Sequence, residues 1–320
     1  MPLYLTFPDW IKPEIISGLP LRWYGLMYVV AFALTYWLFT VQVKRSGQVI
    51  SKDTIGNFFF SGLAGMLVGA RIFATLIYDT SGRYWAAPWL IFWPFDDAGN
   101  FTGFAGMSFH GGLLGVVVGF LLYTRAKKLD MLQWGDWVVA AFPLGYTFGR
   151  LGNFINSELW GRVTTAPWGV LFPNGEPVPV KEAWVQAAMN QTGIQTTDAF
   201  VNLPRHPSQL YEAFGEGLVL WFLFWFLKDR LPFRGFLIGA YLIGYGVVRF
   251  VIEYFRNPDK GLDFIIAFEP GVSTSQLQIP LFNFSMGQIL CVLMVLAGVL
   301  TLVGINAWHK KQANLKTRKR

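Results

Sequence analysis

The densest group of chemically capable residues lies in the segment 149–162, which reads GRLGNFINSELWGR. An arginine guanidinium matches a phosphate group through two parallel hydrogen bonds, and asparagine amides supply further donors. A helix end that faces water can also carry polar residues without any function, but two asparagines, an arginine and a glutamate exceed that need. The segment therefore predicts a site for an anionic headgroup, formed by Arg150, Asn153, Asn156, Glu158 and Gly161.

A second group lies in the run GYGVVRFVIEYFR at positions 244–256. Tyr245, Arg249 and Glu253 are four residues apart, so a helix places them on one face. Two interpretations are open for this face. Either Glu253 only neutralises Arg249 within the structure, or it holds Arg249 as a cation that faces a polar cavity, with the Tyr245 hydroxyl beside it.

Histidine is rare, and two of the three histidines stand in polar motifs. His110 lies in SFHGG and His206 in HPSQLYE, whereas His309 belongs to the basic C-terminal tail. Imidazole exchanges a proton near neutral pH, so His110 is a candidate general base. A single histidine at a membrane interface is more often a hydrogen-bonding residue, and both roles stay open for His110 and His206.

Several motifs of well-known hydrolases and nucleotide enzymes are absent from the sequence. It contains no HExxH, no GxSxG and no P-loop pattern. No cysteine–histidine cluster indicates zinc, the only cysteine being Cys291, and no acidic pair has the spacing to hold a metal. We therefore expect neither a metal ion nor an organic cofactor.

The composition places these residues in a membrane protein. Hydrophobic residues make up 53% of the chain and charged residues only 14%, against about 25% charged in soluble domains. A membrane-spanning helix needs ~20 apolar residues, and the apolar runs do not alternate as barrel strands would. An all-α integral membrane protein with seven spans is expected, at Trp23–Val43, Ile55–Ile77, Met107–Tyr123, Gly135–Ile155, Gln209–Leu227, Gly235–Ile252 and Met286–Ile305.

The lysines and arginines predict how the spans are oriented. The connections after the first, third and fifth spans, together with the C-terminal tail, carry 15 of the 26 basic residues in about 43 positions. The other connections and the N-terminal segment carry 8 in about 135 positions. Because cytoplasmic loops are enriched in basic residues, we expect a cytoplasmic C-terminus and a periplasmic N-terminus. The net charge of +7 then reflects topology and anionic lipids, not nucleic-acid binding.

One transmembrane domain over residues 1–320 is expected, with a small periplasmic cap formed by the insertion 157–208. Small residues four apart let membrane helices approach closely. This spacing predicts helix contacts at Gly65 and Gly69, at Gly111, Gly115 and Gly119, and at Gly145 and Gly149.

Five segments together resemble the bacterial prolipoprotein diacylglyceryl transferase family. The signature GRLGNFINSELWG is the most specific of them. The others, in the family's order, are RWYGLMY at 22–28, SFHGG at 108–112, HPSQLYE at 206–212 and GxxRFxxExxR at 246–256. The resemblance extends over nearly the whole chain.

This resemblance implies a seven-helix enzyme of the bacterial inner membrane that needs no cofactor. Phosphatidylglycerol would donate a diacylglyceryl group to the signal-peptide cysteine of a prolipoprotein, and glycerol phosphate would be released. Arg150 would bind the phospholipid. Positions linked to activity in the family correspond to Tyr28, His110, Asn153, Glu158 and Arg249.

The implied chemistry leaves the activation of the thiol open. A free thiol has a pKa near ~8.5 and is mostly protonated at neutral pH. Either His110 removes its proton, or nearby arginines lower its pKa without a base. Arginines also favour a transition state in which the leaving phosphate gains charge.

Two other classes of membrane protein fit less well. A transporter predicts inverted repeats and polar residues along a path to both faces, and neither pattern is present. A seven-helix receptor does not need a site of arginine and asparagine residues for a phosphate. Both classes stay as alternatives to the enzyme.

Overall fold

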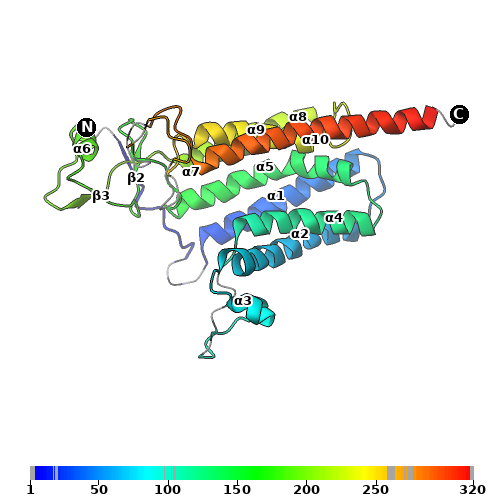
Figure 1. The fold of residues 1–320 in the computed structure, drawn as a ribbon, viewed down its shortest axis with the longest axis horizontal. Coiled ribbons are helices and arrows are strands. Elements are labelled where there is room, and N and C mark those ends of the chain that lie inside the picture. Colours follow the sequence, from blue (N-terminus) through cyan, green and yellow to red (C-terminus); the bar gives the residue numbers. More distant parts are fainter. Residues whose placement is uncertain are drawn as a thin grey trace. The chain divides into compact units, whose positions relative to one another are not determined.

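The computed structural model shows a fold made mostly of helices (Figure 1). It describes residues 4–16, 18, 21–96, 98–101, 103, 106–257, 264–269, 271–272, 277 and 279–317. The last three basic residues of the tail, at positions 318–320, lie outside the described residues.

A helix occupies every segment in which the sequence predicts a span. The largest difference in boundary is at the C-terminus, where the last helix continues to Thr317 instead of ending at Ile305. Two of the segments contain a π-helix, in which the backbone is wider than in an α-helix. The helices are α1 (Trp23–Arg45), α2 (Lys52–Phe73) with η1 (Ala74–Tyr78), α4 (Phe109–Ala126), α5 (Met131–Ile155), α7 (Ser208–Glu212) with η3 (Ala213–Val219) and α8 (Leu220–Leu227), α9 (Phe236–Ile252) and α10 (Met286–Thr317).

Five helical segments among the described residues are long and apolar enough to cross a membrane: Trp23–Arg45, Lys52–Tyr78, Phe109–Ala126, Ser208–Leu227 and Met286–Leu315. The predicted all-α membrane protein is thereby confirmed. Helix α9 is apolar but shorter, and α5 is not among the five. Helix α5 carries the buried polar residues Asp136, Thr147 and Asn153, which lower its hydrophobicity.

The chain divides into two compact units. The larger unit comprises residues 1–39 and 135–320, and the smaller unit comprises residues 40–134. The unit boundaries fall inside α1 and α5, so each of these helices ends or begins in the smaller unit.

In the smaller unit, α2 and α4 lie side by side and meet through glycines (Figure 1). A Cβ atom at Gly65 would contact the carbonyl oxygen of Gly115, and one at Gly69 would lie 2.9 Å from the Gly115 Cα. Gly119 faces the backbone of Ser61 in the same way. The glycine spacing thus has the predicted packing role in these two helices.

The connection between α2 and α4 is attached to the end of α2 by an arginine. Arg71 donates from Nε to the Ile91 carbonyl at 2.5 Å and from Nη1 to the Gly106 carbonyl at 3.4 Å. The connection contains the short helices α3 (Arg83–Ala86) and η2 (Pro88–Phe92). A buried cation in a predicted span therefore serves here to satisfy backbone carbonyl groups.

The helices of the larger unit also pack closely. A Cβ at Gly145 of α5 would lie 2.8 Å from the Ala31 carbonyl oxygen of α1, whereas one at Gly149 would meet nothing within 4 Å. The packing prediction is therefore right for Gly145 and wrong for Gly149. Asp136 of α5 accepts hydrogen bonds from the backbone of Gly235 at 2.6 Å and Leu237 at 2.8 Å, so its carboxylate caps the positive N-terminus of α9.

The insertion 157–208 belongs to the larger unit and has a small apolar cluster of its own. Strand β3 (Val178–Pro179) pairs antiparallel with β4 (Phe200–Val201), and β2 (Val170–Leu171) pairs parallel with β1 (Leu5–Thr6). Helix α6 (Ala183–Thr192) packs its buried residues Val185 and Ala188 into the cluster. The insertion is a folded element, not an open loop.

Candidate active site

Two arginines and three glutamates of the larger unit form one ionic network. Glu212 lies at its centre, since its Oε2 is 2.8 Å from Nε of Arg150 and 3.0 Å from Nη1 of Arg249. Arg249 also lies 3.5 Å from Oε1 of Glu216 and 3.3 Å from Oε2 of Glu253. The predicted contact between Arg249 and Glu253 is therefore present, and the structure adds Glu212 and Glu216. We call these five residues the arginine–glutamate network.

The arginine side chains of the network are partly exposed, whereas its carboxylates are buried. The arginine side chains are 18% and 12% exposed, whereas those of Glu212, Glu216 and Glu253 are 1%, 0% and 5% exposed. Burying a single charge is expensive, and each carboxylate here has at least one cationic partner. The arginine side chains are thus the more accessible part of the network.

Tyr146 connects Arg150 with Glu216 within the network. Its hydroxyl donates a hydrogen bond to Glu216 and accepts one from Nε of Arg150 at 2.7 Å. The Arg150 guanidinium lies 4.9 Å from the centre of the Tyr146 ring. The ring of Tyr245 lies edge to face with this ring, with the two planes at 87° and the two ring centres 6.2 Å apart. Arg150 is consequently held from several directions, in a fixed orientation.

The π-helix η3 determines where the glutamates lie. Glu212 ends α7 and Glu216 lies within η3, so both carboxylates point from neighbouring turns of one segment. Gly217 packs against Thr147 of α5, whose hydroxyl donates to the Ala213 carbonyl at 3.3 Å. Single turns of π-helix occur frequently at functional sites. Here the π-helix lies between the arginines of α5 and α9.

The turn after α5 extends the network through amide groups. Nη1 of Arg150 donates to Oδ1 of Asn153 at 3.3 Å, and Nδ2 of Asn153 donates to Oε1 of Glu158 at 2.9 Å. Asn156 donates to the same carboxylate oxygen at 3.5 Å. The four predicted headgroup residues Arg150, Asn153, Asn156 and Glu158 are thereby brought together.

This turn has an unfavourable backbone conformation that other residues stabilise. Ser157 and Leu159 both have a positive φ, 53° and 54°, which costs ~1–3 kcal/mol for a residue other than glycine. The start of α7 fixes the turn: Gln209 donates to the Glu158 carbonyl at 2.6 Å, and Ser208 donates to the Leu159 carbonyl at 3.1 Å. Such strain is typical of functional sites.

Gly161 lies where three segments of backbone converge. Its N–H donates to the His206 carbonyl at 2.8 Å, and it forms a bridge with Arg256. A Cβ atom at this position would contact the Phe255 carbonyl and lie 2.8 Å from Cβ of His206. The structure thus gives Gly161 a packing reason to be glycine, independent of any headgroup.

Glu253 connects the network to the N-terminus of α10. Its Oε1 accepts a hydrogen bond from the Ser285 hydroxyl at 3.4 Å, and a Cβ at Gly287 would lie 2.6 Å from the same oxygen. The N-terminus of a helix favours negative charge. Nη1 of Arg256 lies 3.9 Å from Oε2 of Glu253. Glu253 therefore has three stabilising partners: Arg249, Arg256 and the N-terminus of α10.

Tyr28 belongs to α1, where its hydroxyl lies 2.9 Å from that of Tyr24. Tyr28 is 44% exposed, and the side chain of Tyr24 interacts with Asn153. The tyrosine pair thus joins α1 to the turn that carries Glu158.

His110 lies in the smaller unit, in the first turn of α4, and is exposed. Its Nδ1 is 2.9 Å from the Tyr78 hydroxyl at the end of η1. This contact fixes the orientation of the imidazole ring and leaves Nε2 without a hydrogen bond among the described residues.

His206 lies outside the membrane-spanning segments and remains neutral. Burial, with the positive charge of Arg162 nearby, lowers the pKa of His206 to about 4. Its Nδ1 is 3.0 Å from the Tyr211 hydroxyl, which accepts a hydrogen bond from the Trp168 indole at 2.9 Å. Since an indole only donates, the hydroxyl is free to donate to His206.

Two further arginines of the insertion are 3% exposed. Arg162 donates to the Tyr254 carbonyl at 3.2 Å, and Arg205 donates to the Glu176 carbonyl at 2.7 Å. Burial lowers the pKa of each guanidinium to about 10, so both stay cationic at neutral pH. Arg205 thus joins two parts of the insertion, and Arg162 attaches the insertion to the segment that follows α9.

Sequence reasoning missed Glu212, Glu216 and Tyr146. The available clue was a pair of acidic residues four apart within a predicted span, which is as unfavourable in a membrane as Arg71, Arg150 and Arg249 are in the other predicted spans. Among the described residues, no three His, Cys, Asp or Glu side chains are placed to hold a metal ion.

Fold and site together define a multi-pass, all-α membrane protein with a buried ionic network in its larger unit. Comparison with known proteins makes the class more specific. The profile of the family described as prolipoprotein diacylglyceryl transferase matches residues 13–304. Similar proteins, each named phosphatidylglycerol–prolipoprotein diacylglyceryl transferase, occur in Treponema denticola, with 47% identity over 97% of both chains, and in Treponema pallidum, with 45% identity over 99% of both. One from Borreliella burgdorferi is 40% identical over 95% of this chain and 94% of its own.

This chain belongs to the prolipoprotein diacylglyceryl transferase family and is a transferase.

Proposed function

We propose that this protein transfers the diacylglyceryl group of phosphatidylglycerol to the lipobox cysteine of prolipoprotein signal peptides. The cysteine sulfur attacks the glycerol carbon that bears the phosphate, a carbon–sulfur bond forms, and the carbon–oxygen bond to the phosphate breaks. Glycerol phosphate leaves with the bonding electrons, and the thiol proton passes to a base or to solvent. This would be the first step of bacterial lipoprotein maturation.

The arginine–glutamate network is the observation that carries this proposal within the family. Its two partly exposed arginine side chains suit the phosphate of a lipid headgroup, and ion pairs hold them in place before the substrate arrives. Fixed donors stabilise charge that develops on a leaving group at little cost of reorganisation. We assign catalytic roles to Arg150 and Arg249.

The remaining site residues take supporting roles in the proposal. His110 acts as the base for the thiol, and Tyr28 as a further catalytic residue. Headgroup binding involves, besides Arg150, one tyrosine, two asparagines, two glutamates and one glycine: Tyr245, Asn153, Asn156, Glu158, Glu253 and Gly161.

The proposed topology has seven spans in the bacterial inner membrane. Helices α5 and α9 would supply the two spans beyond the five long apolar ones. Under the basic-residue rule the N-terminus is periplasmic and the C-terminus cytoplasmic. The whole chain then forms one transmembrane domain, and the insertion 157–208 caps it on the periplasmic side.

The test is a reconstituted transfer assay. Purified protein in detergent or nanodiscs is incubated with phosphatidylglycerol labelled in its acyl chains and with a lipobox peptide. Label should move to the peptide, and glycerol phosphate should appear in equal amount. A peptide with serine in place of the cysteine is the matched control. Label transfer to neither peptide, under conditions where the protein is folded, would refute the proposed function.

A further inference from the structure

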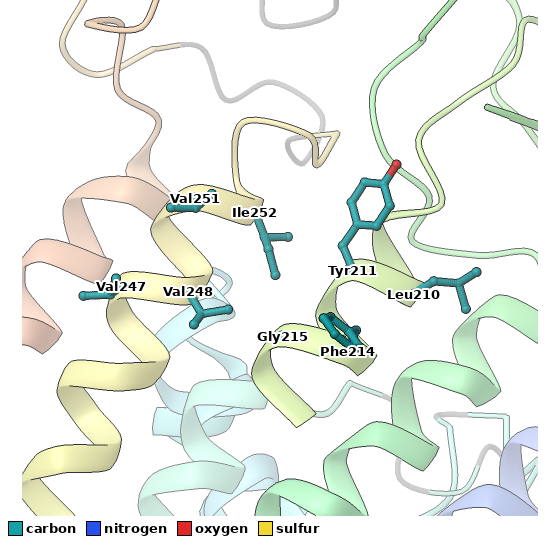
Figure 2. Close-up of a pocket in the computed structure, with 8 residues that line it drawn as sticks. All are labelled: Leu210, Tyr211, Phe214, Gly215, Val247, Val248, Val251 and Ile252. Carbon is teal, nitrogen blue, oxygen red and sulfur yellow. The ribbon is translucent and has the colours of Figure 1, made fainter. Parts of the chain in front are cut away.

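An apolar groove of about 510 Å³ lies between two helical segments of the larger unit (Figure 2). Eight residues line it, four from α7–η3 and four from α9. Their side chains are hydrocarbon except for the hydroxyl of Tyr211. Phe214, Val247 and Val251 on its walls are 64%, 51% and 53% exposed, so the groove opens on the lipid-facing side of two apolar helices.

The depth of the groove depends on a glycine. A Cβ atom at Gly215 would lie 2.8 Å from Cγ1 of Val248, so the two helices touch at this point and their larger side chains diverge outward from it. Gly215 is part of π-helix η3, the segment that also carries Glu216. The backbone that places the glutamates therefore also forms the floor of the groove.

The groove and the arginine–glutamate network occupy adjacent faces of the same helices. Glu212 follows Tyr211 in sequence, Glu216 follows Gly215, and Arg249 follows Val248. Consecutive residues differ by about 100° around a helix of 3.6 residues per turn. A molecule in the groove consequently contacts residues that directly precede Glu212, Glu216 and Arg249 of the ionic network.

One end of the groove is polar because it carries the Tyr211 hydroxyl, which two neighbouring side chains hold in place. The Tyr211 hydroxyl accepts from the Trp168 indole at 2.9 Å and lies 3.0 Å from Nδ1 of His206. His206 precedes α7, so this hydroxyl points to the end where α7 begins. The groove thus has the polarity of a fatty-acyl chain, with one polar end and a long apolar remainder.

We propose that this groove holds one acyl chain of the donor phospholipid, with the ester end toward Tyr211. This assignment rests on the proposed function, which supplies a phospholipid as substrate. A volume of about 510 Å³ falls within the range of ~300–1,000 Å³ that is usual for small-molecule sites. A peptide helix ~10 Å wide occupies about 400 Å³ in each turn of 5.4 Å, so the groove has room for little more than one turn of a signal peptide.

The first test fills the groove and varies the length of the acyl chain. Val251→Trp places an indole in it, and Leu300→Trp places one on an exposed position of α10 as a matched control. Transfer is measured with phosphatidylglycerol carrying palmitoyl or octanoyl chains. Val251→Trp should lower kcat/KM about tenfold for the palmitoyl lipid, which loses the burial of several methylene groups, and much less for the octanoyl lipid. Leu300→Trp should leave both values unchanged. An equal loss with both lipids, or no loss, overturns the proposal.

The second test does not depend on transfer. Phosphatidylglycerol with a photoreactive diazirine within one acyl chain is cross-linked to the full-length protein in nanodiscs, and labelled residues are located by mass spectrometry. Labelling of Phe214 or Val247 supports the groove, and labelling elsewhere alone overturns it. Labelling of the groove by a lipobox peptide that carries the diazirine, without labelling by the lipid, also overturns it. If the lipid labels the groove while the wild-type protein transfers nothing, the proposed function fails and the lipid site remains.

Discussion

Helices are held together in different ways in the two units. In the smaller unit, α2 and α4 meet at Gly65, Gly69 and Gly115, where backbone lies directly on backbone. In the larger unit, α5, α7 and α9 are joined by charged side chains around Glu212. Glycine contacts exclude any larger side chain but carry no charge, whereas buried charges are expensive to form and available for chemistry. The glycine contacts of the smaller unit therefore serve packing, whereas the charged contacts of the larger unit are also available for function.

The largest expected effect on transfer is that of a substitution in the smaller unit, and it would show that this unit also takes part in the chemistry. If His110 is the general base, His110→Asn should lower transfer by ~10²–10⁴-fold. The loss should shrink as the pH rises toward ~8.5, because solvent then deprotonates the thiol. Transfer rates between pH 6 and 9 measure this.

Tyr78→Phe, which removes the partner of Nδ1, is the related control and should have a smaller effect. A loss of equal size at every pH would assign His110 to orientation or lipid binding. The smaller unit would then contain no base.

Glu212→Gln tests the larger unit directly. The variant keeps the shape of the side chain and removes the charge that both arginines share. Breaking a buried ion pair costs ~3–5 kcal/mol of stability, and displaced arginines should reduce transfer about 10²-fold. Thermal unfolding and transfer, each measured in detergent, report the two effects.

Glu182→Gln at an exposed position provides the control and should change stability by less than ~0.5 kcal/mol. Normal activity of Glu212→Gln would show that the network is not required for transfer. The contrast between the units would then be one of packing only.

Arg150→Lys separates charge from geometry within the network. Lysine keeps the positive charge but has one nitrogen, and it cannot contact Tyr146 and Asn153 as the guanidinium does. We expect transfer to fall about 10- to 100-fold, the result of losing charged hydrogen bonds. Near-normal transfer by this variant, at normal protein levels, would reduce Arg150 to a generic cation.

Gly115→Ala should affect folding more than chemistry. The added Cβ would contact the Gly65 carbonyl, and such overpacking costs ~1–3 kcal/mol. Activity per folded molecule should change little. Gly56→Ala in α2 is the matched control: nothing lies within 4 Å of its Cβ, so it should be neutral or stabilise by ~0.5–1 kcal/mol. Equal unfolding temperatures for the two variants would contradict the role given to backbone contact.

The smallest effect concerns how stability depends on pH. Since the folded pKa of His206 is lowered to about 4, the unfolded chain binds more protons between about pH 6.5 and 4. The contribution of His206 to stability is therefore present above pH 6.5 and lost as the pH falls toward 4. Wild-type protein should lose a few degrees more in melting temperature over this interval than His206→Gln. An identical pH dependence in both proteins would show that His206 does not titrate on unfolding.

The sequence predicted the helices well and the network only in part. Spans are set by the length of apolar runs, which is a local property, and Arg249 with Glu253 follows from helical spacing. The contact of Arg150 with Glu212 depends instead on the relative placement of two helices, α5 and α7. The π-helix η3, which contains Glu216 and directly follows Glu212, is not visible in the residue pattern.

The strained backbone at Ser157 and Leu159 could not be predicted from the sequence either. Nothing in the types of Ser157 and Leu159 indicates a positive φ, because the conformation is imposed by Gln209 and Ser208 from a segment about fifty residues later. The sequence placed Gly161 in the predicted headgroup site, which stays a prediction, and its close contact with the backbone of Phe255 emerges only when distant segments meet.

Helix α10 has a practical consequence for anyone who attaches a label to this protein. It continues to Thr317, and its last twelve residues, from position 306, rise about 18 Å at 1.5 Å per residue. A hydrocarbon layer of ~30 Å is crossed by ~20 residues, which this helix has already supplied before that point. A fluorophore or affinity tag fused to the C-terminus would therefore be held away from the bilayer on a rigid stalk. Antibodies and resins should reach it without a flexible linker, and distances measured from it should be offset by the length of the stalk.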